Sequence, residues 1–147
     1  MTDHVIDSFS GPHAFLSNFW PCEIQWEGAW YFSTEAAFQA DKTTDLEYRK
    51  HIQCAKDPAA AKRLGRKAQL RPDWESRKFD TMLALLRLKF QDPHLKGLLL
   101  DTGDTTLVEK NHWKDTIWGV CNGVGQNMLG KLLMQVRDEI KAYPSTP

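Results

Sequence analysis

Prolines mark where helices can begin in this chain, and they constrain its fold more than any other sequence feature. Pro58, Pro72 and Pro93 each stand just before a run rich in apolar, helix-forming residues. Proline lacks a backbone N–H and has a fixed φ, so the first turn of a helix tolerates it and the interior does not. The chain is therefore predicted to form separate short helices, the longest from about residue 72 to residue 90.

The other predicted elements are also short. Strands are predicted at residues 5–9, 23–26, 30–32 and 105–109, with turns at 11–13 and 27–28. Ser33 or Thr34 should cap a helix over 35–42, and further helices are predicted over 46–54, 59–68, 93–100 and 126–142, the last ended by Tyr143-Pro144. The helices do not alternate with strands, which excludes a doubly wound sheet. The predicted fold class is a helix-rich α+β single domain with a few short strands, over residues 1–147 with its core at about 9–140.

Charge is balanced in total and uneven along the chain. Lys+Arg and Asp+Glu both number 19, which argues against binding nucleic acid or membrane by bulk charge alone. Residues 56–89, however, carry 10 basic and 4 acidic side chains, whereas residues 1–55 carry 3 and 8. Such a basic segment is either an anion-binding face or an ordinary solvated helix surface.

The cysteines exclude some functions. Cys22, Cys54 and Cys121 are far apart, and no CxxC or His/Cys cluster has the spacing of zinc ligands, so neither a metal nor a cofactor is expected. The first residues lack the apolar core of a signal peptide, and no segment is long enough to span a membrane. We therefore expect a cytoplasmic protein with no membrane partner.

Two sequence features have both a structural and a chemical interpretation. Glu35, at a predicted helix start, either compensates the helix dipole or holds a carboxylate at the mouth of a cleft. The glycine-rich loop 118–127 is either a structural turn or a cradle in which the N–H groups at the start of the last helix bind a phosphate.

Trp74, Asp115 and the basic stretch 62–71 also have one structural and one chemical interpretation each. Trp74 either stacks a base or lies in the core, and Asp115 either caps a turn or serves as a second acid. The stretch 62–71 has five cations and no acid, and binds phosphate or forms a solvated face.

Several segments, in order, resemble the signatures of one family, the NADAR superfamily of YbiA-like N-glycosidases. They are Phe15–Pro21 (FLSNFWP), Ser33–Ala40 (STEAAFQA) with Lys42, Ala61–Arg66 (AKRLGR), Asp73-Trp74 with Lys78, and the C-terminal half from Leu99 to Arg137. The resemblance covers about residues 9–140. Cys121 replaces a glycine that is usual two places after Trp-Gly, and Ala36 stands where the family often has a histidine.

The resemblance implies an enzyme that hydrolyses a ribose C1′–N bond. The expected substrate is ADP-ribose attached to guanine, in a nucleoside or in DNA. The alternative is a phosphoribosylamino-pyrimidine intermediate of riboflavin synthesis. A carboxylate can stabilise the oxocarbenium-like ribose or activate water, so Glu35 is the expected catalytic residue and Asp115 its expected partner.

The resemblance also implies a set of substrate-binding residues. Trp74 is expected to stack on the base or ribose. The others are expected to hold phosphate or position the sugar; they are Asn18, Phe19, Lys42, Lys62, Arg63, Arg66, Lys78, Trp118, Gly119, Gly125 and Asn127. Two rival hypotheses are a non-catalytic module that binds ADP-ribose or nucleotides and a helical interaction domain. The oligomeric state is left open.

Overall fold

Caps and prolines begin the helices where local chemistry favours them. The computed structural model describes residues 4–143, so Pro144 and both ends of the predicted 1–147 domain lie outside the described residues. Ser33 caps the first α-helix by accepting a hydrogen bond from the Ala36 N–H at 3.0 Å, and Asp57 and Asp92 cap two later helices in the same way, each followed by a proline.

The chain is organised as two compact units, each described here by itself. The central unit comprises residues Asn18–Lys89, and the terminal unit comprises Met1–Ser17 and Phe90–Pro147. The central unit contains β2 (Pro21–Trp26), β3 (Ala29–Ser33), α1 (Thr34–Asp41), α2 (Leu46–Gln53), α3 (Pro58–Arg66) and α4 (Trp74–Lys89). The terminal unit contains β1 (Val5–Ile6), a 3-10 helix η1 (Gly11–Leu16), α5 (Pro93–Asp101), β4 (Thr106–Leu107), β5 (Lys110–Asn111), β6 (Val120–Cys121) and α6 (Met128–Ala142).

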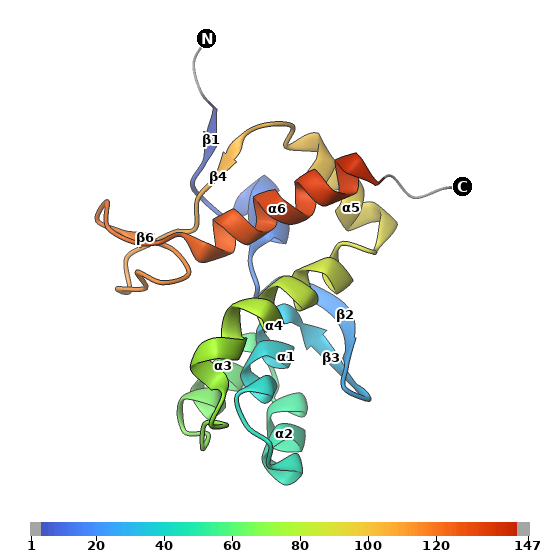
Figure 1. Ribbon diagram of the computed structural model, residues 1–147, viewed down its shortest axis with the longest axis vertical. Helices are drawn as coiled ribbons and strands as arrows, with labels where there is room; N and C mark the ends of the chain where they lie inside the picture. Colours follow the sequence, from blue (N-terminus) through green and yellow to red (C-terminus); the bar gives the residue numbers. More distant parts are fainter. Residues whose placement is uncertain (1–3, 144–147) are drawn as a thin grey trace. The chain divides into compact units, whose positions relative to one another are not determined.

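In the central unit, α1 is the element around which the others pack. It contacts α2, α3 and α4 as well as the antiparallel β2–β3 hairpin (Figure 1). All eight of its residues are buried, which is why its sequence lacks the polar face of a surface helix. The hairpin turns at Glu27-Gly28, where both residues have positive φ.

In the terminal unit, α6 supplies an apolar face and two small parallel strand pairs fix distant segments. Leu129, Leu132, Leu133 and Val136 are buried along α6, and α6 contacts both α5 and β4. β1 pairs with β4 (Figure 1), and β5 pairs with β6; both pairs are parallel.

The predicted fold class, helix-rich α+β with a few short strands, is confirmed. The strands predicted at 5–9 and 105–109 shorten to two residues each, and the turn predicted at 11–13 belongs to the 3-10 helix. β5 and β6 were not predicted, because a two-residue strand has no periodicity to recognise. Among residues 4–143, no helix is long and apolar enough to cross a membrane.

Candidate functional site

Glu35 is a buried carboxylate held from two directions. It occupies the first turn of α1 and is 7% exposed. Its backbone N–H donates to the Asn18 carbonyl at 3.0 Å, and its Oε1 accepts from Gln39 Nε2 at 2.7 Å. A buried carboxylate loses its hydration, so charge and hydrogen-bond partners close to it decide what it can do.

Three basic side chains from α3 and α4 act electrostatically on Lys42 in the same unit. Lys42 follows the last residue of α1, and burial is the largest cause that lowers its pKa; the charges of Lys62, Arg66 and Lys78 lower it further, and the charge of Glu35 opposes them. We call Lys42, Lys62, Arg66 and Lys78 the cation cluster. Lys62 and Arg66 lie four residues apart on α3, and therefore on one face of it.

The cation cluster suits a phosphate. Glu75 pairs with Lys78 at 2.6 Å, and a phosphate offers further oxygens to Lys and Arg alike. The buried carboxylate of Glu35, whose charge acts on Lys42, adds the acid–base group that a hydrolase needs. The central unit thus combines a candidate catalytic group with a candidate anion site.

Of the other residues predicted for binding, Asn18 contacts Glu35 through its backbone. Asn18 holds the Glu35 N–H through its carbonyl, its Nδ2 lies 3.7 Å from Met82 Sδ, and Phe19, the next residue, is 41% exposed. Arg63 is exposed on α3, and a phosphate-binding role for it stays a prediction.

Trp74 is placed as a core residue. It is 5% exposed, and its ring packs against Phe38 with ring centroids 5.1 Å apart and an interplanar angle of 58°. Stacking on a base needs an open ring face. The placement matches the core interpretation given above, and a stacking role for Trp74 stays a prediction.

Asp115 and Trp118 lie in the terminal unit, where Asp115 acts as a local cap. Its Oδ1 accepts from the N–H groups of Ile117 and Trp118 at 3.1 and 2.9 Å, so this oxygen is committed to the turn. Asn111 holds the same turn by donating to the Asp115 carbonyl at 2.8 Å. A catalytic role for Asp115 stays a prediction.

Most backbone N–H groups at the start of the last helix are paired within the fold. Of the N–H groups at 125–127 that were expected to hold phosphate, those of Gln126 and Asn127 donate to carbonyls at 2.7 and 3.2 Å, and those of Met128 and Leu129 at the helix start do the same. The expectation assumed unpaired N–H groups. A phosphate-binding role for Gly125 stays a prediction.

Close backbone packing explains why this loop is rich in glycine. A Cβ on Gly125 would collide with backbone atoms of Gly119 and Val120 in the same loop, and Gly125 has φ +154°. A Cβ on Gly119 would collide with the carbonyl and the carboxylate of Glu109. Asn127 uses its side chain to bridge the Leu107 carbonyl and the Glu109 N–H, at 3.0 and 2.9 Å. These three predicted binding residues therefore have structural roles in the fold.

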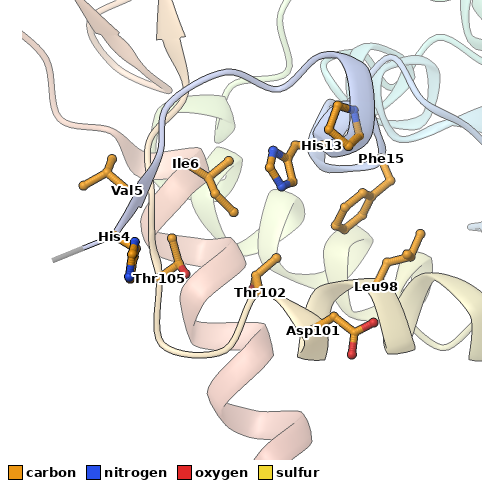
Figure 2. A pocket seen from close by; sticks show the side chains of 10 residues that line it. His4, Val5, Ile6, His13, Phe15, Leu98, Asp101, Thr102 and Thr105 are labelled. Carbon is orange, nitrogen blue, oxygen red and sulfur yellow. The ribbon is translucent and has the colours of Figure 1, made fainter. Parts of the chain in front are cut away.

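A pocket of about 430 Å³ lies wholly within the terminal unit. Its lining side chains come from η1 and from the segments around β1 and α5 (Figure 2). It combines the imidazoles of His4 and His13 with the apolar Ile6, Phe15 and Leu98, and none of the predicted site residues lines it. Among the described residues, no group of three or more His, Cys, Asp or Glu side chains could hold a metal ion.

Sequence reasoning missed Gln39. Its amide is the hydrogen-bond donor to Glu35, and it is 4% exposed. The signal was present: Gln39 follows Glu35 by four residues on a predicted helix, a spacing that places two side chains side by side.

Comparisons with known proteins identify the same family that the sequence motifs resemble. The NADAR domain family model matches residues 7–141. N-glycosidase YbiA of Escherichia coli (strain K12) is 38% identical over 148 residues, which cover 95% of this chain and 91% of that protein. A riboflavin biosynthesis protein of Vibrio vulnificus (strain YJ016) is 41% identical over 135 residues; these cover 89% of this chain and only 36% of that longer protein.

A solved structure supports the same assignment. The NMR structure of the E. coli protein YbiA matches with a TM-score of 0.86 and 37% identity, covering all of this chain and 92% of that one. Family model, sequence relatives and solved structure agree over almost the whole length. The chain therefore belongs to the NADAR domain family.

Proposed function

We propose that this chain is an N-glycosidase that hydrolyses the C1′–N bond of a phosphorylated ribosyl compound, with ADP-ribose attached to guanine as its substrate. The observation that carries the proposal is the buried carboxylate of Glu35 in one unit with the cation cluster. Breaking this bond calls for a carboxylate near the sugar and cations for the phosphates. Several relatives are named N-glycosidase YbiA, which supports the reaction class.

The proposed mechanism assigns one task to each group. As the C1′–N bond breaks, its electron pair leaves with the nitrogen, and positive charge develops on the ribose. Glu35 stabilises that charge or accepts a proton from the attacking water, whose oxygen bonds to C1′; the proton that the water loses ends on the departing nitrogen. The cation cluster binds the phosphate oxygens and fixes the ribose relative to Glu35.

A second substrate class is supported by a different observation. Two relatives are named riboflavin biosynthesis proteins, one from Vibrio vulnificus and one from Zea mays. A phosphoribosylamino-pyrimidine carries the same ribose C1′–N bond and a phosphate, so the same residues would act on it. This chain matches only 36% and 23% of those two proteins, so their whole activity need not reside in the matched part.

The experiment compares the wild type with Glu35→Gln on three substrates: ADP-ribosylated guanosine, single-stranded DNA carrying ADP-ribosylated guanine, and a phosphoribosylamino-pyrimidine. Chromatography measures release of the base and of the ribosyl product. We expect the variant to lose at least about 100-fold in kcat, as expected when a catalytic carboxylate is neutralised. Glu47→Gln is the matched control, because Glu47 also lies in the first turn of a helix but is exposed.

Each outcome decides between hypotheses. Full activity in folded Glu35→Gln contradicts the catalytic assignment. Tight binding of ADP-ribose by the wild type without turnover of any substrate favours the non-catalytic module. If the phosphoribosylamino-pyrimidine is turned over faster than either guanine substrate, the pyrimidine and not ADP-ribosylated guanine is the substrate.

A further inference from the structure

Burial removes water from the side-chain amide of Gln39, and the hydrogen bonds that the amide makes replace that water only in part. The side chain is 4% exposed, and its Nε2 donates to Glu35 Oε1 at 2.7 Å. Within the part of the chain that the structure describes, its Oε1 is buried and accepts no hydrogen bond. A buried carbonyl without a donor is unfavourable, and such a group in a native protein calls for an explanation.

The amide is held in this orientation by both of its neighbours. A carboxylate can only accept hydrogen bonds, so the NH₂ end of Gln39 must face Glu35 when Glu35 is ionised. On the opposite side, the backbone of α3 lies directly against the amide: a Cβ on Gly65 would overlap Gln39 Oε1. Glycine at position 65, which has no Cβ, therefore leaves room for the Gln39 amide.

We propose that Gln39 is a positioning residue: it fixes the orientation of the Glu35 side chain and favours its ionised form, in a slot that exists because residue 65 is glycine. The inference rests on the proposed function, in which Glu35 is catalytic. Lys42 is a charged group that interacts electrostatically with Glu35, and the charges of Lys62, Arg66 and Lys78 also act on Lys42. These cations stay in place in the variants below, so a change in pH profile reports on the amide.

The test removes the donor without changing the size of the side chain much. In Gln39→Met, kcat should fall by about 10- to 100-fold while KM changes little, because a misoriented carboxylate impairs the reaction more than binding. The acidic limb of the pH–rate profile should move to higher pH, since a donated hydrogen bond favours the charged form of a carboxylate. Gln39→Glu should move that limb further in the same direction, because it places a like charge beside Glu35.

A second variant displaces Gln39 without altering its chemistry. Gly65→Ala should push the amide away from its position and produce the same fall in kcat and the same shift of the acidic limb. The double variant Gln39→Met with Gly65→Ala should be no slower than the slower single variant, because both remove one interaction. Gly97→Ala is the matched control: Gly97 is also a helical glycine, and a Cβ there meets nothing within 4 Å.

The outcomes distinguish a failure of the inference about Gln39 from a failure of the proposed catalytic role of Glu35. If Glu35→Gln abolishes activity while the variants of Gln39 and Gly65 keep the wild-type kcat and pH profile and only melt at lower temperature, Gln39 is structural and this inference is wrong. If Glu35→Gln keeps full activity, the catalytic assignment and this inference both fail. If Gln39→Met does not fold, Gln39→Glu and Gly65→Ala carry the same test.

Discussion

A single aspartate organises the polar interior of the central unit. Asp41 is 0% exposed, and its carboxylate accepts hydrogen bonds at 2.7–3.0 Å from Trp26 Nε1, Thr81 Oγ1 and two nitrogens of Arg77. Burial alone would raise the pKa of Asp41, but these hydrogen bonds outweigh it and hold the pKa below its usual range. The residue therefore joins β2 and α4 to the end of α1 most strongly in its ionised form.

Replacing Asp41 by asparagine should destabilise the protein by about 3 kcal/mol, because the Arg77 guanidinium would face an amide that cannot neutralise it. The free energy of unfolding in urea at pH 7 measures this. Asp73→Asn is the control, because Asp73 pairs with Arg71 at the surface, and it should change stability little.

The pH dependence of that difference has a defined sign. A carboxyl group with a depressed folded pKa stabilises the protein above its unfolded pKa, and this contribution is lost as the pH falls through the folded value. The gap between wild type and Asp41→Asn should therefore be largest above about pH 5 and shrink toward pH 2. A gap that stays constant over this range would show that Asp41 does not contribute through its charge.

Asn127 and Asn122 offer a second comparison at the scale of single residues. Both have left-handed backbones, with φ of 54° and 52°, but Asn127 is buried and bridges two backbone groups, whereas Asn122 is exposed. Asn122→Ala should lower the free energy of unfolding only by the cost of holding alanine in a left-handed backbone conformation. Asn127→Ala should cost about 2 kcal/mol more, because it leaves a buried N–H and a buried carbonyl without partners.

Thermal melting of the two variants checks this difference. If both variants lose the same stability, the side-chain bridge of Asn127 contributes nothing to the stability of the loop.

At the scale of elements, α3 combines a structural face with a binding face. Ala61 and Gly65 are buried on the side toward α1, while Lys62 and Arg66 belong to the cation cluster. The aspartate cap and the first-turn proline fix where the helix begins, and therefore which residues face which way. The same helix thus supplies both the slot for Gln39 and two candidate phosphate ligands.

The double variant Lys62→Gln with Arg66→Gln should raise KM for the phosphorylated substrate by at least about 10-fold and change kcat less, because charge-assisted hydrogen bonds to phosphate are lost. It should also weaken the salt dependence of kcat/KM. Lys67→Gln removes a charge from the exposed end of the same helix and serves as the control. Equal effects of the two variants would mean that the helix contributes only general electrostatic attraction.

At the scale of the whole molecule, buried basic groups make stability depend on pH in the alkaline range. Burial lowers the pKa of Lys89 to about 8, and Lys89 is 1% exposed. An unfolded lysine titrates near 10.4, so between these values the unfolded chain binds more protons than the folded one. The contribution of Lys89 to the free energy of unfolding therefore rises with pH between about 8 and 10.5.

Lys89→Met should remove this rise. The difference in free energy of unfolding between wild type and variant should change by about 2–3 kcal/mol between pH 7 and pH 10, in favour of the wild type at the higher pH. Chemical unfolding at one-unit pH intervals measures it. Parallel curves for the two proteins would contradict a buried, titrating Lys89.

The zero net charge of the chain conceals the arrangement that matters for function. The basic segment 56–89 folds into α3 and α4, and α1, which carries Glu35, packs against both. Opposite charges that are separate in sequence thus come within electrostatic reach of each other in one unit. Balanced totals are compatible with a strongly charged local site.

The sequence by itself determined the positions of the helices. Ser33, Pro58 and Pro93 act on residues within one turn of themselves, so their effect can be predicted without knowing the rest of the fold. The fold class followed from the same local signals. The resemblance to one family singled out Glu35, and the distribution of charge pointed to the basic segment.

Only the tertiary structure decided which groups are available and which are already paired. The N–H groups at the start of α6 looked free in sequence, but carbonyls 8 to 11 residues earlier in the chain pair with them. The strand pair β1–β4 and the contact of Gly65 with Gln39 join residues that local propensity cannot connect. The physical reason is range: caps and turns depend on neighbours in sequence, whereas burial and hydrogen-bond pairing depend on neighbours in space.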